Sequence, residues 1–141
     1  MSDVEIIEFG VFSSTEIPFF TMSVAAGIPV PVDTEVDSHV DLNEFLVEHP
    51  NATFFAKVRN ESMLTAGIRD GDILVVDKAI QPTDGRIVVV SVNNSLTVKY
   101  YRIVGDDVYL ESDNSQFIPL NFGNLIDYII LGTVTKVIHS F

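Results

Sequence analysis

The chain has 141 residues, of which 47% are hydrophobic, and a formal net charge of -12. This length suits one domain, the apolar content is too high for a disordered acidic tail, and no apolar run approaches the roughly 18 residues of a membrane span. Cysteine is absent, which excludes disulfides, thiolate metal sites and a cysteine nucleophile and favours a cytoplasmic location.

The first part of the chain is acidic and is interrupted by turn-forming residues. Residues 1–56 contain ten acidic side chains and no lysine or arginine, although the whole chain has eight basic residues. Because an acidic surface repels phosphate backbones, we expect no direct binding of nucleic acid. The prolines within 28–32 favour an extended linker. Residues 1–40 are therefore predicted to form an N-terminal arm and linker, and residues 41–141 the main domain.

One short helix is predicted at the start of this domain. Asp41 is a common helix-capping residue type, Leu42, Phe45 and Leu46 recur at helical spacing, and Pro50 stands just beyond the expected end.

From residue 52 onward the pattern is typical of β structure. Segments rich in valine, isoleucine and aromatic residues predict strands at 53–58, 73–77, 86–92, 95–104, 108–112 and 128–139. Turn sequences separate them, at Asp70-Gly71-Asp72, Thr83-Asp84-Gly85, Asn93-Asn94 and Gly105-Asp106-Asp107. The closely spaced turns indicate a mainly β fold with a strongly curved antiparallel sheet.

A short helical turn is predicted between the first two of these strands, at 60–67, with Asn60 as its cap and Gly67 as its end. Ser62 would then lie in the first turn, where backbone N–H groups have no intrahelical partner and can stabilise an oxyanion. Serine is also common in such positions without any catalytic role, so this feature alone does not identify a nucleophile.

Lys99 is the second unusual residue, because most of its neighbours in the predicted strand are apolar or aromatic. With a period of two it shares a face with Thr97, Tyr101 and Ile103. Burial of this face would lower the pKa of the amine, and a neutral amine can take a proton from a serine hydroxyl. The alternative is an exposed lysine on an edge strand, which discourages aggregation.

Three segments resemble one peptidase family. Ser62-Met63, followed by a Gly-x-x-Asp-Gly-Asp motif that begins at Gly67, is similar to the nucleophile segment of the LexA, phage-repressor and UmuD peptidases. Thr97-Val98-Lys99 resembles the strand of the catalytic lysine and follows the serine by the spacing of the UmuD branch. Ala26-Gly27 resembles the cleavage site of the family. The resemblance covers most residues from 26 to 141.

The resemblance implies a β-rich body of the LexA/UmuD type, with one or two short helices and a mobile N-terminal arm. It implies a self-cleaving serine peptidase in which Ser62 is the nucleophile and Lys99 the base. The backbone N–H groups of Glu61 and Ser62 would bind the oxyanion, and the cut would fall between Ala26 and Gly27. Small side chains there would let the serine approach the carbonyl. No cofactor or metal is expected.

The resemblance also implies partners. In the UmuD branch the RecA–single-stranded-DNA filament stimulates cleavage in the SOS response to DNA damage. The product then acts as the accessory subunit of an error-prone UmuC-type translesion DNA polymerase. The chain is expected to form a homodimer, and no membrane partner is expected.

The sequence leaves other functions open. An acidic β-domain that only binds a polymerase remains an alternative, as does a LexA-like transcriptional regulator, although the first 56 residues lack the basic recognition helix that a regulator needs. His39, His49 and His139 are scattered and read as ordinary residues rather than metal ligands or members of a serine–histidine–aspartate triad. The acidic N-terminus argues against a secretory signal ending at Ala26.

Overall fold

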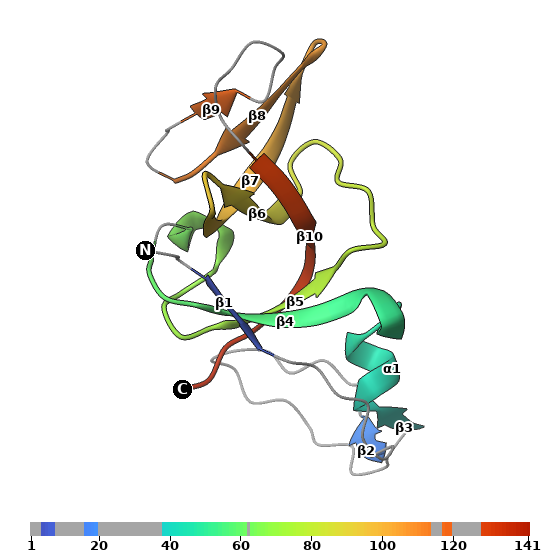
Figure 1. The fold of residues 1–141 in the computed structure, drawn as a ribbon. Helices are drawn as coiled ribbons and strands as arrows, with labels where there is room; N and C mark the ends of the chain where they lie inside the picture. The colour runs from blue at the N-terminus through green and yellow to red at the C-terminus, as the bar shows by residue number, and fades with distance from the viewer. Residues whose placement is uncertain (1–3, 8–15, 20–37, 62, 114–116, 120–127) are drawn as a thin grey trace, which may run out of the picture.

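The computed structural model describes residues 4–7, 16–19, 38–61, 63–113, 117–119 and 128–141. Its main feature is an eight-stranded antiparallel sheet in the order β1-β4-β5-β10-β6-β7-β8-β9, accompanied by a two-stranded sheet of β2 and β3 (Figure 1). The large sheet is not closed, because β1 and β9 form its two edges. The prediction of a mainly β fold with a curved antiparallel sheet is confirmed.

The elements follow one another along the chain in this order: β1 Val4–Ile7, β2 Glu16–Phe19, β3 Ser38–Asp41, α1 Leu42–Leu46, the 3-10 turn η1 Pro50–Ala52, β4 Thr53–Val58, the 3-10 turn η2 Leu64–Ala66, β5 Ile73–Asp77, β6 Ile87–Val92, β7 Ser95–Val104, β8 Asp107–Glu111, β9 Phe117–Pro119 and β10 Tyr128–Ile138. The bounds predicted for β4, β5 and β7 agree with these, and the other three predicted strands agree to within one residue at each end. The strands β1, β2, β3 and β9 were not predicted.

The predicted capping of α1 and the predicted hairpin turns are also confirmed. The side chain of Asp41 accepts a hydrogen bond from the backbone N–H of Asn43 at 3.0 Å. Between β6 and β7, Asn93 and Asn94 have positive φ angles of 49° and 66°. Asparagine tolerates this left-handed backbone, which matches the twist of a two-residue hairpin.

Strand β10 lies at the centre of the large sheet and gives it its curvature. Its first half pairs with β6 and its second half with β5, and the register shifts between Ile130 and Gly132 and again between Val134 and Lys136. Such bulges bend a strand. A Cβ atom on Gly132 would lie 2.7 Å from Val76 Cγ1 and 3.1 Å from the Asp77 carbonyl oxygen, so only glycine fits at the first bulge. Figure 1 shows β10 curving from β6 down to β5.

The core is divided between two clusters of side chains. The larger contains Val4, Ala56, Val58, Met63, Ile68, Leu74, Val76, Val89, Val98 and Val134. The smaller contains Val88, Val90 and Leu110. Neighbouring residues of β6 belong to different clusters, so this strand is covered on both of its faces.

Part of the predicted arm belongs to the sheet. Strand β1 pairs with the edge of β4, where Val4 lies opposite Val58 and is only 2% exposed. Glu5 forms an ion pair with Arg59, and this guanidinium holds the pKa of the Glu5 carboxyl below its usual value. The linker at 28–32 lies outside the described residues. Among the helices that the structure describes, none is long and apolar enough to cross a membrane.

Candidate active site

The segment that carries Ser62 connects β4 to β5. Its two ends are tied together by backbone hydrogen bonds, from the N–H of Val58 to the carbonyl of Asp72 at 2.9 Å and from the N–H of Gly71 to the carbonyl of Val58 at 2.8 Å. Residue 62 itself lies outside the described residues, and so do Ala26 and Gly27. Glu61 is described and is exposed, whereas Met63 is buried in the larger core cluster.

The helical turn in this segment begins later than predicted. The structure has a 3-10 turn at Leu64–Ala66 with Met63 at its N-cap, so the prediction that Asn60 caps the turn is wrong. The predicted end is confirmed, because Gly67 has a left-handed φ of 81° and its N–H binds the carbonyl of Leu64 at 2.9 Å. Position 62 therefore precedes the turn in the sequence, and the predicted placement of oxyanion donors in a first helical turn is not confirmed.

Polar contacts bring this segment to strand β7. The backbone N–H of Thr65 donates to Asp113 Oδ2 at 2.6 Å, and its hydroxyl donates to the other oxygen of the same carboxylate. The Thr65 hydroxyl also lies 3.3 Å from the Tyr100 hydroxyl. Since Tyr100 directly follows Lys99, the segments predicted to carry nucleophile and base are neighbours in space.

Lys99 lies in the middle of β7 and is partly buried, opposite Val88 of β6. Val98 belongs to the larger core cluster and Tyr100 packs against that cluster, whereas Val88 belongs to the smaller one. Because side chains alternate along a strand, Lys99 lies on the opposite face of β7 from Tyr100.

Lys99 lies just beyond the end of the pairing between β7 and β8. Pairing between β7 and β8 runs from Val104 back to Tyr100, the neighbour of Lys99. Asp113, which holds Thr65, follows shortly after β8. The nucleophile segment thus reaches β7 where its described pairing with β8 ends.

The prediction of a buried face around Lys99 is confirmed in part. Thr97 is 8% exposed and Tyr101 packs against the smaller core cluster, whereas Ile103 is 42% exposed. The face is thus covered at one end of the strand and open at the other.

A buried carboxylate supports the end of the nucleophile segment. Asp72 is 1% exposed, and its Oδ2 accepts a hydrogen bond from the backbone N–H of Arg69 at 2.9 Å. Its Oδ1 lies 2.6 Å from Nδ1 of His139, just beyond β10. The sequence identifies Asp72 only as part of a turn and His139 as an ordinary residue. A contact across 67 positions leaves no local signal in the sequence.

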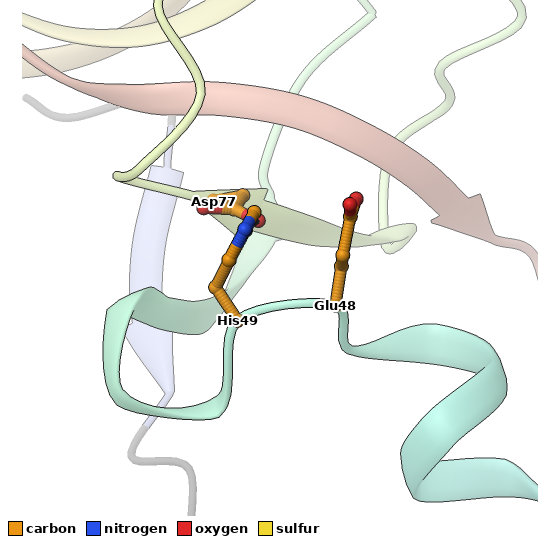
Figure 2. A group of neighbouring side chains, drawn as sticks. All are labelled: Glu48, His49 and Asp77. Carbon is orange, nitrogen blue, oxygen red and sulfur yellow. Dashed lines mark hydrogen bonds and ion pairs between the residues drawn. The ribbon is translucent and has the colours of Figure 1, made fainter.

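The opposite end of β5 carries a second pair of the same kind. Asp77 is 2% exposed; its Oδ1 accepts from the N–H of Ala79 at 2.8 Å and its Oδ2 lies 2.6 Å from His49 Nδ1. The hydrogen bond to Asp77 raises the pKa of His49, with a smaller contribution from the Asp77 charge and a further one from Glu48. His49 and His139 thus each have a buried aspartate as a partner, which the sequence did not predict. Figure 2 shows Glu48 beside this pair.

Comparisons with known proteins agree with the resemblance seen in the sequence. Residues 18–135 match the family described as Peptidase S24-like. The chain is 38% identical to Protein ImpA of Salmonella typhimurium over 86% of its own length and 83% of that protein. It is 41% identical to Protein MucA of Escherichia coli over 59% of the chain and 57% of MucA. It is also 41% identical to the LexA repressor of Shewanella woodyi, over 69% of the chain and 47% of that repressor.

Proposed function

Because the chain belongs to the S24-like peptidase family, we propose that it cleaves its own backbone between Ala26 and Gly27, with Ser62 as nucleophile and Lys99 as base. Self-cleavage in the SOS response is the activity of the UmuD branch, and the similarity to ImpA, MucA and LexA extends that activity to this chain.

The proposed reaction is an acyl transfer in two steps. The neutral amine of Lys99 accepts the hydroxyl proton of Ser62 while the serine oxygen attacks the carbonyl carbon of Ala26. As the family resemblance implies, backbone N–H groups of Glu61 and Ser62 would stabilise the resulting oxyanion. The proton then passes to the amine of Gly27 as the peptide bond breaks. Water hydrolyses the acyl-enzyme and frees the serine.

The observation that carries this proposal is the contact between the Thr65 and Tyr100 hydroxyls, at 3.3 Å. It brings the segment three residues beyond Ser62 to strand β7 next to Lys99, whose own side chain lies on the opposite face of the strand from Tyr100. The anchoring of Thr65 by Asp113 supports the same arrangement, because it holds the segment where the described ladder between β7 and β8 ends. Part of the face that Lys99 shares with Thr97 and Tyr101 is buried.

The pairing of β1 with β4 supports a regulatory role for the cut. Strand β1 lies on the N-terminal side of the proposed scissile bond, so cleavage would leave it attached only by its hydrogen bonds, its ion pair and the burial of Val4. Its departure would expose the edge of β4. We propose that this edge then serves the homodimer or a UmuC-type polymerase, and that the RecA filament stimulates the cut in the cytoplasm.

The mechanism is tested by following self-cleavage through the intact mass of the chain across a range of pH. The wild-type rate should rise toward alkaline pH, because only the neutral form of a lysine amine accepts a proton. Ser62→Ala and Lys99→Arg should remain uncleaved, since arginine keeps its charge. Lys57→Arg, on an exposed side chain of β4, is the matched control and should be processed normally. Processing of Lys99→Arg at the wild-type rate would remove this lysine from the mechanism.

The scissile bond is tested separately with Ala26→Asp and Gly27→Glu. Each larger, charged side chain should stop cleavage while the far-ultraviolet circular dichroism of the body stays unchanged. Normal processing of either variant would place the cut elsewhere. If Ser62→Ala retained every function of the wild type, the chain would instead be a binding module.

The switch is tested by comparing the full chain with a variant that lacks residues 1–26. Affinity for the polymerase subunit, or for a second copy, should differ between the two because only the shorter form has a free β4 edge. Equal affinities would contradict an arm-gated surface while leaving the catalytic proposal intact.

A further inference from the structure

We propose that Glu48, His49 and Asp77 form a binding site for a divalent transition-metal ion, with zinc as the best fit. One potential ligand atom from each residue lies within 4.8 Å of the others. Figure 2 shows His49 reaching from the segment between α1 and η1 to Asp77 at the end of β5, with the Glu48 side chain rising beside it from the same segment. This site is separate from the proposed active site and does not depend on it.

The chemistry of the three donors fits zinc better than calcium or magnesium. One imidazole and two carboxylates are ligand types that zinc takes in proteins, and a fourth position would remain for water. Calcium and magnesium prefer sites built entirely from oxygen ligands. The imidazole therefore selects for a transition metal.

The local charge also favours a cation. Two carboxylates converge here, and one of them, Asp77, is 2% exposed. Among the ion pairs within the described ranges, none brings a lysine or arginine to either carboxylate, and His49 is the sole cationic partner of Asp77. A bound dication would neutralise a negative charge that only a partly exposed imidazole balances in its absence.

The distance between the His49 and Asp77 ligand atoms requires only a small adjustment to hold zinc. His49 Nδ1 and Asp77 Oδ2 are 2.6 Å apart, whereas two ligands of a tetrahedral zinc, each at about 2.0–2.2 Å, lie about 3.3 Å from each other. The His49 side chain is 43% exposed and Glu48 is exposed, so both can move. Asp77 stays in place because Ala79 holds its other oxygen at 2.8 Å. Zinc would take the place of the hydrogen bond between the His49 and Asp77 side chains.

The other pair supplies a matched control. His139 and Asp72 have the same separation of 2.6 Å and nearly the same exposure, 40% for the histidine and 1% for the aspartate. Within the described part of the chain, no third ligand joins that pair to form a metal-binding group. If a histidine beside a buried aspartate were sufficient to bind zinc, both pairs would bind it.

The test is a calorimetric titration of the full chain with zinc after treatment with a chelator, repeated with cobalt(II) to record its visible absorption. We expect saturable binding of one ion, with the cobalt spectrum of a low-coordinate site. Glu48→Gln and His49→Gln should each weaken binding by about tenfold or more, since even changes in outer-shell groups cost about 10- to 100-fold. His139→Gln should bind as the wild type does.

Three outcomes would overturn the proposal. These are an absence of saturable binding, equal binding by wild type, Glu48→Gln and His49→Gln (an adventitious ion only), and loss of binding in His139→Gln alone. Circular dichroism of each variant distinguishes lost binding from lost folding. Because Glu48 is exposed, Glu48→Gln should fold in every case and keeps the test decisive.

Discussion

The two ends of strand β5 use the same arrangement of side chains in different surroundings. Asp72, just before the strand, and Asp77, at its end, are both buried, and each accepts one backbone N–H and one histidine Nδ1 at 2.6 Å. At the first end the pair closes the segment that carries Ser62. At the second end it fixes the connection that follows α1, and Glu48 stands beside it.

The two ends show that a histidine–aspartate pair takes its role from the residues around it. A buried carboxylate costs free energy unless its oxygens are hydrogen-bonded, and both aspartates meet that condition with a backbone amide and an imidazole. The pairs themselves therefore explain stability at both ends of β5. Any difference in function has to come from the segment proposed to carry the nucleophile at one end and from Glu48, the proposed third metal ligand, at the other.

The largest expected effect separates the two aspartates by their influence on self-cleavage. Asp72→Ala should slow cleavage by about 100-fold, because the segment carrying Ser62 loses its anchor and a misplacement of about 1 Å costs a factor of this size. Asp77→Ala should leave the rate within a few-fold of wild type. Rates are measured by intact mass, under conditions where circular dichroism shows both variants folded. Equal slowing would mean that both ends serve stability alone.

The second prediction concerns the strand that packs against Asp77. Gly132→Ala should destabilise the chain by about 1–3 kcal/mol, because the added Cβ would meet Val76 Cγ1 at 2.7 Å and the backbone of Asp77. The measurement is the midpoint of urea unfolding. The dependence of the unfolding free energy on urea concentration should stay unchanged, because the folded body keeps its compactness. A midpoint equal to that of wild type would show that the first bulge of β10 can relax.

A smaller effect is expected from the two histidines. His139→Gln should slow self-cleavage by only a few-fold, because Asp72 still accepts the hydrogen bond from the backbone N–H of Arg69. His49→Gln should not change the rate. If both variants cleave at the same reduced rate, the distinction between the two ends of β5 is wrong.

The smallest effect is the pH dependence of stability at the second end. Asp77 raises the pKa of His49 above its unfolded value of 6.5, so the pair stabilises the fold fully below that pH. This stabilisation is lost as the pH rises through the folded pKa. In chelator-treated protein, wild type and His49→Gln should thus differ most in thermal midpoint near pH 5.5 and least near pH 8.5. A difference that grows with pH would contradict the assigned direction.

The sequence by itself determined the elements whose signals are local. Three strands have the predicted bounds: Thr53–Val58, Ile73–Asp77 and Ser95–Val104. Their signal is local, because β-branched and aromatic residues favour strands and the glycine- and asparagine-rich segments between them favour turns. Asp41 caps α1 as predicted because its partner, Asn43, is two residues away. The motifs around Ser62 and Lys99 likewise identified the family, since each motif is a short continuous stretch of the chain.

Tertiary structure decided what depends on distant partners. Strand β1 has only four residues, so it depends on pairing with the edge of β4 to form. The turn after Ser62 begins at Leu64 rather than near Asn60, and the next residue, Thr65, is held by Asp113, 48 positions away. The two histidine–aspartate pairs join residues separated by 28 and 67 positions. Such contacts form only when the curved sheet brings the ends of β5 beside β10 and the segment after α1, and no local pattern encodes that geometry.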